Sequence, residues 1–113
     1  MSAITTHVLD LSRGRPAAGV PVQLDMRDAQ GWRRLAEGAT GPDGRLGTLL
    51  PAGAPLAQGT YRLRFDTAAW FATQGDEGFF PEASIVFEVR EPAAHYHLPL
   101  LLSPFGYSTY RGS

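Results

Sequence analysis

The residues of this chain best suited to acid–base chemistry are its three histidines. Two of them, His95 and His97, are separated by a single residue. In an extended strand, residues with this spacing share a face. The third, His7, would share a face of an N-terminal strand with Leu9 and Leu11. A neutral imidazole, whose pKa is about 6.5, can accept a proton from water at neutral pH. The histidines are therefore candidates for a general base, and a structural role is the alternative for each ring.

One arginine is placed to supply positive charge. Arg45 follows Gly41-Pro42-Asp43-Gly44, a sequence typical of a type I turn. The turn would hold Arg45 at the start of a strand, where its planar guanidinium could bind substrate oxygens. An ordinary solvated arginine after a hairpin is the alternative.

The C-terminal residues form a third polar cluster. Tyr110, Arg111 and Ser113 lie within the last four positions, in a region that is usually frayed unless it is tied into a sheet. Strict alternation points Tyr110 and Arg111 to opposite faces, so one pocket uses both only if the strand twists or two subunits contribute. Ser113 lacks the Gly-x-Ser-x-Gly context of a serine nucleophile, which favours water as the nucleophile.

Three histidines could also bind zinc, because three imidazoles and a water make a catalytic zinc site. The chain has no cysteine, and the nearest carboxylate before the histidine pair is Glu91, four residues before His95. A carboxylate that orients the rings is a usual partner of such ligands. We therefore expect no metal at these residues.

Composition limits the remaining classes of protein. A chain of 113 residues with 43% hydrophobic residues predicts one globular domain spanning residues 1–113. A net charge of -1 gives no general attraction to nucleic acid or to anionic lipid. All ten basic residues are arginines, which excludes lysine chemistry. The start of the chain does not resemble a signal peptide, and no apolar run has membrane-spanning length, so we expect a soluble cytoplasmic protein.

Alternating hydrophobic and polar residues predict an all-β fold. The alternation and the turn residues between segments predict strands at residues 4–11, 20–27, 32–40, 46–50, 61–66, 85–90, 96–103 and 106–111. Many short strands with Gly, Pro and Asp between them favour an antiparallel β-sandwich. Residues 67–75 predict one short helix, with Thr67 as its capping residue and Gly75 at its end.

Two of the predicted strands are apolar on both faces. In the strand at residues 96–103, three leucines share one face, and Pro99 and Leu101 lie on the other. A sandwich sheet that is apolar on its outside is best explained by a partner subunit, so we expect a homo-oligomer. Pro99 cannot donate to a ladder and should lie at an edge or a bulge.

Over nearly its whole length the chain resembles the 5-hydroxyisourate hydrolase branch of the transthyretin-like family. The terminal Tyr110-Arg111-Gly112-Ser113 is the most specific of the matching motifs. The others are Thr6-His7-Val8-Leu9-Asp10, Gly14-Arg15-Pro16-Ala17, Asp43-Gly44-Arg45 and His95-Tyr96-His97-Leu98-Pro99-Leu100-Leu101-Leu102-Ser103-Pro104.

This resemblance implies a transthyretin-like (prealbumin-like) antiparallel β-sandwich of seven to eight strands with one short helix. It implies a homotetramer, built as a dimer of dimers, with sites at the interface between dimers. The implied reaction is hydrolysis of the small molecule 5-hydroxyisourate to 2-oxo-4-hydroxy-4-carboxy-5-ureidoimidazoline in urate degradation, without metal or organic cofactor.

The resemblance also implicates particular residues. One of His7 and His97 would activate water, and Arg45 would bind substrate and stabilise the developing oxyanion. Tyr110 and Arg111 would bind substrate and shape the pocket, and Ser113 would hydrogen bond to substrate or to a histidine. The role of His95 stays open. The alternative function is that of a non-enzymatic, transthyretin-like carrier of small molecules, which would have no use for these residues together.

Overall fold

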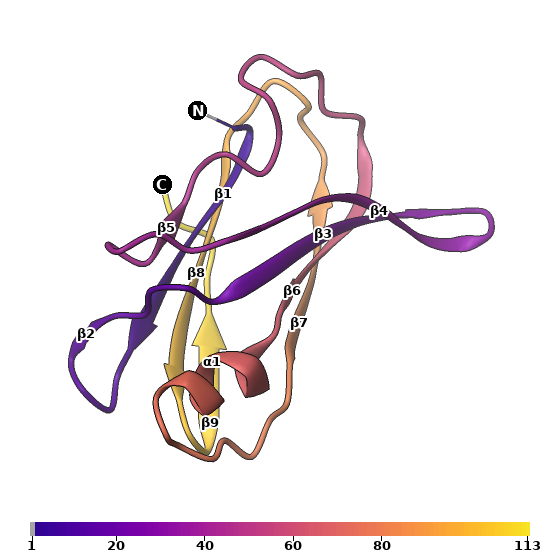
Figure 1. The fold of residues 1–113 in the computed structure, drawn as a ribbon. Coiled ribbons are helices and arrows are strands. Elements are labelled where there is room, and N and C mark those ends of the chain that lie inside the picture. The colour runs from indigo at the N-terminus through magenta and orange to yellow at the C-terminus, as the bar shows by residue number, and fades with distance from the viewer. Residues whose placement is uncertain (1) are drawn as a thin grey trace.

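Two β-sheets packed face to face make up the computed structural model, which describes residues 2–113 (Figure 1). The first sheet has the order β2-β1-β8-β9, with β5 also paired to β1, and the second has the order β4-β3-β6-β7. The strands are β1 (Ile4–Asp10), β2 (Arg15–Pro16), β3 (Pro21–Asp28), β4 (Gly31–Ala39), β5 (Arg45–Leu46), β6 (Gly59–Phe65), β7 (Ala83–Val89), β8 (Tyr96–Ser103) and β9 (Gly106–Thr109). In the described chain, seven of these have four or more residues and the single helix is short. The expected sandwich is confirmed.

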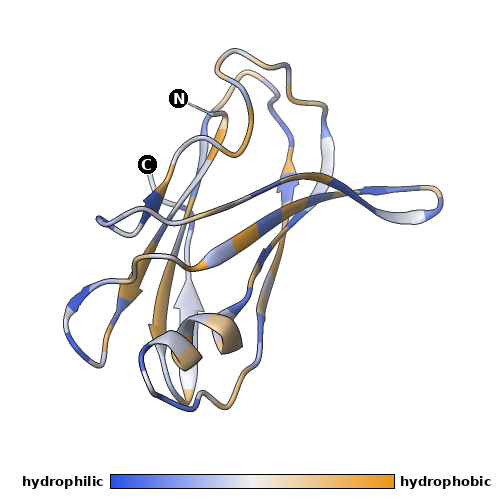
Figure 2. Cartoon of the chain, in the orientation of Figure 1, coloured by the Kyte–Doolittle hydropathy of each residue, from blue (hydrophilic) through white to orange (hydrophobic). Residues whose placement is uncertain are grey.

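The core lies between the sheets and follows the alternation seen in the sequence (Figure 2). Val8 in β1 and Leu100 in β8 are fully buried. Because successive side chains of a strand point to opposite faces, His7 and His97 face outwards from the same sheet. The same pattern buries alternate residues of β3 and β6.

The two strands that carry histidines run parallel, whereas the other neighbouring strands in the described sheets are antiparallel. The parallel register pairs Thr5 of β1 with His97 of β8. On its other side β1 pairs with β5, and there His7 lies opposite Arg45. Paired residues of neighbouring strands point to the same face, so these four residues share the outer face of the first sheet.

The helix α1 (Thr67–Thr73) lies at one end of the sandwich (Figure 1). Its N-cap is Asp66, whose carboxylate accepts a hydrogen bond from the Ala69 N–H. The prediction of Thr67 as the cap is therefore wrong. Thr67 is the first helical residue, and its buried hydroxyl donates to the Phe80 carbonyl at 2.6 Å. Gly75 follows the helix with a φ of +72°, as expected of a residue that ends a helix.

One predicted strand is much shorter than expected. The alternation at residues 46–50 predicted a strand of five residues, but β5 ends at Leu46. Leu49, only 6% exposed, packs into the core from the following loop. The apolar residues after Leu46 thus anchor a loop and do not extend the sheet.

Pro99 lies inside the first sheet, between β1 and β9, so the prediction of an edge position is wrong. The His97 carbonyl accepts a hydrogen bond from Gly112, and the Pro99 carbonyl accepts one from the Thr109 hydroxyl. The missing N–H of Pro99 therefore faces the side on which β9 runs, and β9 ends at Thr109. The central strand tolerates proline because the pairing on that side is interrupted at Pro99, between the Leu100–Thr109 pair and the His97–Gly112 bridge.

Candidate active site

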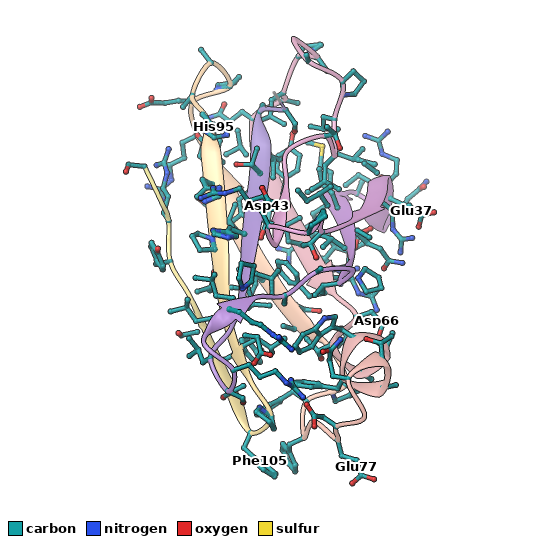
Figure 3. All side chains as sticks on the ribbon, turned by 60° about the vertical axis from the view of Figure 1, so that its left-hand side comes forward. Glu37, Asp43, Asp66, Glu77, His95 and Phe105 are labelled. Carbon is teal, nitrogen blue, oxygen red and sulfur yellow. The ribbon has the colours of Figure 1, made fainter. Side chains whose placement is uncertain are left out.

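A cavity of about 220 Å³ opens on the outer face of the first sheet, near the starts of β1 and β8. It lies towards the end of the sandwich that carries His95, opposite the end that carries Phe105 (Figure 3). The lining residues are Thr5, Thr6, Arg45, Leu46, Gly47, His95, His97 and Ser113. Three of the expected catalytic residues, His97, Arg45 and Ser113, are thus brought together from β8, β5 and the C-terminus.

Thr5 connects the two histidines of the cavity. Its hydroxyl lies 2.8 Å from His97 Nδ1 and 3.0 Å from His95 Nε2. The two rings are nearly parallel, with an interplanar angle of 23° and centroids 6.4 Å apart. Sequence reasoning missed Thr5, although its position, two residues before His7 in a strand, placed it on the same face.

His7 lies beside the cavity and is not part of its lining. Its Nε2 is 2.9 Å from the Asp43 carbonyl oxygen, which can only accept a hydrogen bond. His7 therefore carries its hydrogen on Nε2 when neutral. The structure places His7 next to the lining residue Arg45, with which it is paired between β1 and β5.

The turn before Arg45 has the expected form. The Gly44 N–H donates to the Gly41 carbonyl at 2.8 Å, and the Asp43 carboxylate accepts from the Arg45 N–H at 3.0 Å. Gly44 has a φ of +77°, and a Cβ there would lie 2.5 Å from the Val8 carbonyl oxygen. Only glycine lets the turn approach β1 this closely, and that approach sets the positions of Asp43 and Arg45.

The C-terminal segment returns to β8 after β9 ends. The Gly112 N–H donates to the His97 carbonyl at 2.8 Å, which forms an isolated bridge. This bridge continues the register in which Leu100 lies opposite Thr109. It brings Ser113 into the cavity.

Tyr110 and Arg111 are not brought to the cavity. The Arg111 guanidinium stacks on the ring of Tyr96 at 4.5 Å, and its Nη2 lies 3.5 Å from the His95 carbonyl oxygen. Tyr96 is a core residue, so Arg111 lies on the opposite face of the sheet from His97. Both tail residues line a second cavity of about 210 Å³, together with Ile85, Phe87, Glu88, Leu98 and others.

The surroundings of His97 favour its neutral form. Partial burial lowers its pKa below the usual 6.5. The positive charge of Arg45 lowers it further, as does repulsion between His97 and the rings of His95 and His7 when they are protonated. A hydrogen-bonding contribution from the Thr5 main chain raises the pKa and offsets part of this effect. At pH 7 the His97 ring is therefore neutral and able to accept a proton.

Within residues 2–113, no group of three or more His, Cys, Asp or Glu side chains is arranged to hold a metal ion. Two of the three histidines bind the same hydroxyl, and the third binds a backbone carbonyl. Each ring thus has at least one nitrogen engaged by the protein itself.

Comparison with known proteins identifies the family. Residues 4–112 match the model of the HIUase/Transthyretin family. The chain belongs to this family. Within the HIUase/Transthyretin family it is similar to a 5-hydroxyisourate hydrolase of Caulobacter vibrioides, with 47% identity over an alignment of length 117 that covers 100% of both chains.

Solved structures of the HIUase/Transthyretin family agree with the fold. The 5-hydroxyisourate hydrolase of Klebsiella pneumoniae is 45% identical, covers 100% of both chains and gives a TM-score of 0.86. Sea bream transthyretin in complex with thyroxine is 34% identical, covers 97% of this chain and 94% of the other, and gives 0.89. The backbone is thus common to a 5-hydroxyisourate hydrolase and to a transthyretin that binds thyroxine, and function must be decided at the site.

Proposed function

We propose that this chain hydrolyses 5-hydroxyisourate to 2-oxo-4-hydroxy-4-carboxy-5-ureidoimidazoline in urate degradation. The observation that carries the proposal is the convergence of His97, Arg45 and Ser113 on one cavity. The high identity to enzymes named 5-hydroxyisourate hydrolase supports it. A carrier has no need of an imidazole and a guanidinium lining the same cavity, so the carrier alternative is less supported.

In the proposed mechanism a water molecule attacks the ring carbonyl carbon of the substrate. His97 is assigned as the base, because it lines the cavity and its lowered pKa keeps it neutral. It takes one proton from the attacking water while the C–O bond forms. When the C–N bond of the ring breaks, the same proton passes to the leaving nitrogen, so His97 returns to its neutral state.

Arg45 is assigned to the negative charge that develops on the carbonyl oxygen. Its guanidinium is positively charged and has N–H donors in a fixed, planar arrangement. The hydrogen bond from the Arg45 N–H to the Asp43 carboxylate holds the main chain at this position. Ser113, at the tip of the tail, is assigned to hydrogen bonding with substrate, and His7 to support of the cluster from beside Arg45.

We further propose that the active form is a homotetramer, a dimer of dimers. The cavity is open on the outer face of the first sheet, so a second copy facing it would shield the cavity from bulk solvent. Leu11 beyond β1 is 54% exposed and Val86 on β7 is 53% exposed, and such apolar residues favour contact between subunits. In a tetramer, Tyr110 and Arg111 could serve the site of a neighbouring copy. Light scattering coupled to size exclusion should give four times the chain mass of 12.2 kDa.

The location of the protein stays a prediction. The described chain contains no helix of sufficient length and apolarity to span a bilayer. The proposed cytoplasmic location is tested by fractionation of the host cell with an antibody to the chain.

The activity is tested by generating 5-hydroxyisourate freshly with urate oxidase and following its ultraviolet absorbance. We expect decay faster than the spontaneous rate, unaffected by a chelator. Arg45→Gln should abolish the acceleration, whereas Arg33→Gln, on the exposed strand β4, should retain it. Decay at the spontaneous rate with the unaltered protein would refute the proposed activity, and loss of activity with chelator would refute the metal-free mechanism.

A further inference from the structure

The bridge formed by Thr5 between two imidazoles restricts where hydrogens can lie. A hydroxyl has one hydrogen to donate and two lone pairs that accept. Thr5 Oγ1 lies within hydrogen-bond distance of His97 Nδ1 and His95 Nε2. The Thr5 hydroxyl can accept from both ring nitrogens, but its own hydrogen then has no acceptor among the side-chain hydrogen bonds of the described chain. Thr5 both donates and accepts only when one ring nitrogen carries a hydrogen and the other presents a lone pair. The tautomers of the two neutral rings are therefore coupled through Thr5.

Two arrangements satisfy this rule. In one, His95 Nε2–H donates to Thr5 and Thr5 donates to His97 Nδ1, so His97 carries its hydrogen on Nε2 and cannot act there as a base. In the other, His97 Nδ1–H donates to Thr5 and Thr5 donates to His95 Nε2. The second arrangement leaves His97 Nε2, on the ring edge away from Thr5, with a free lone pair.

The charges around His97 favour the second arrangement. Arg45 and His97 line the same cavity, and the cation acts on the ring. Nδ1 is taken up by Thr5, so Nε2 is the ring nitrogen left to interact with the cation. A lone pair on Nε2 is attracted to this positive charge, whereas an N–H would be repelled. His95 is exposed, so water can hydrogen bond to its Nδ1 in either tautomer and its ring can adapt to Thr5.

We propose that Thr5 and His95 are positioning residues that hold His97 in the tautomer with hydrogen on Nδ1 and a lone pair on Nε2. This inference rests on the proposed function only for its consequence for catalysis. Thr5 is 6% exposed and sits in the paired register of β1 and β8, so its hydroxyl is held in place by the sheet. His95 accepts the Thr5 hydrogen and completes the series of hydrogen bonds. The two histidines on either side of Tyr96 therefore have different roles: His97 is the proposed base, and His95 helps to position it.

The tautomers can be measured directly in the resting protein. The chain has three histidines, so the ring ¹⁵N signals of labelled protein can be assigned with His7→Gln and His95→Gln variants. We expect His97 Nδ1 to give the signal of a protonated nitrogen and Nε2 that of an unprotonated one. The reverse pattern for His97 would overturn the inference, whether or not the protein hydrolyses 5-hydroxyisourate.

Two substitutions of Thr5 test the consequence for catalysis. Thr5→Val removes the hydroxyl with little change in shape, and Thr5→Ser retains it. We expect Thr5→Val to lower kcat on the order of 10- to 100-fold with KM within about 3-fold, because the base is present in the wrong tautomer. Thr5→Ser should stay within about 3-fold of the unaltered kcat, since the hydroxyl is the group that matters.

Thr60→Val, in β6 of the other sheet, is the matched control. It should leave kcat unchanged, and thermal melting should establish that each variant is folded. In Thr5→Val we also expect the His97 ¹⁵N signals to move towards the pattern with hydrogen on Nε2. Equal kcat for Thr5→Val and the unaltered protein, or unchanged His97 tautomer signals in that variant, would overturn the inference. Absence of hydrolysis by the unaltered protein would instead count against the proposed function and leave the tautomer measurement valid.

Discussion

Gly112 lies against both the main chain and the imidazole ring of His97. The Gly112 N–H donates to the His97 carbonyl at 2.8 Å, and a Cβ placed on Gly112 would lie 2.7 Å from His97 Cδ2. The tail thus touches both the main chain and the ring of the proposed base. This contact explains why a glycine stands next to the last residue: any side chain there would occupy the space of the imidazole.

Gly112→Ala should impair catalysis more than stability. The new methyl group must displace the His97 ring by several tenths of an ångström or more, and small errors of position are costly in catalysis. We expect kcat to fall on the order of 10- to 100-fold. Gly106→Ala is the control, because its Cβ would meet only Ser103 Oγ at 3.9 Å. Equal kcat for the two variants would show that the tail does not position His97.

Removal of residues 110–113 should abolish hydrolysis of 5-hydroxyisourate while leaving a cooperative thermal unfolding transition. The tail contributes Ser113 to the cavity and the bridge to His97, but none of its residues belongs to the buried core. The measurement is kcat/KM together with the unfolding curve. A truncated chain that retains its activity would contradict the assigned role of the tail.

The pH dependence of kcat/KM should follow the titration of His97. The base is active in its neutral form, which predominates above its pKa, and burial together with Arg45 lowers that pKa below 6.5. We therefore expect kcat/KM to fall as the pH is lowered, with a midpoint below the 6.5 of an unperturbed imidazole.

Removal of the positive charge of Arg45 should raise the pKa of His97. In Arg45→Gln the pKa of His97 should rise towards 6.5, because the Arg45 cation opposes protonation of the ring. The ring ¹H signals of His97 report the pKa directly, even when activity is lost. An unchanged His97 titration in Arg45→Gln would show that the two groups do not interact.

Gly44→Ala should destabilise the fold and with it the turn that carries Asp43 and Arg45. Alanine at a φ of +77° is strained, and its Cβ would lie 2.5 Å from the Val8 carbonyl oxygen. We expect a loss of about 2–4 kcal/mol in the free energy of unfolding, measured with urea. Gly53→Ala has a similar φ of +75° with open space around its Cβ, and it should lose only about 1–2 kcal/mol.

Local sequence patterns were sufficient for the architecture and for part of the site. Alternation located the longer strands. It also predicted that His95 and His97 share a face and that His7 shares one with Leu9 and Leu11, because the period of a strand depends only on chain geometry. The Pro-Asp-Gly turn before Arg45 was likewise predictable, because turn preferences are local. The prediction of Thr67 as a cap failed where two adjacent polar residues competed for one position, and Asp66 took it.

The partners of each site residue were decided by contacts that no local pattern contains. Thr5 lies beside His97 through a parallel register between strands about ninety residues apart, and a shift of two residues would have placed His7 there instead. Arg111 stacks on Tyr96 on the far face of the sheet, although its place in the sequence suggests a role beside Ser113. The sequence by itself determined which side chains of a strand share a face, since that follows from backbone geometry. Only the tertiary structure determined which side chains meet, because strand register is selected by burial of the whole core.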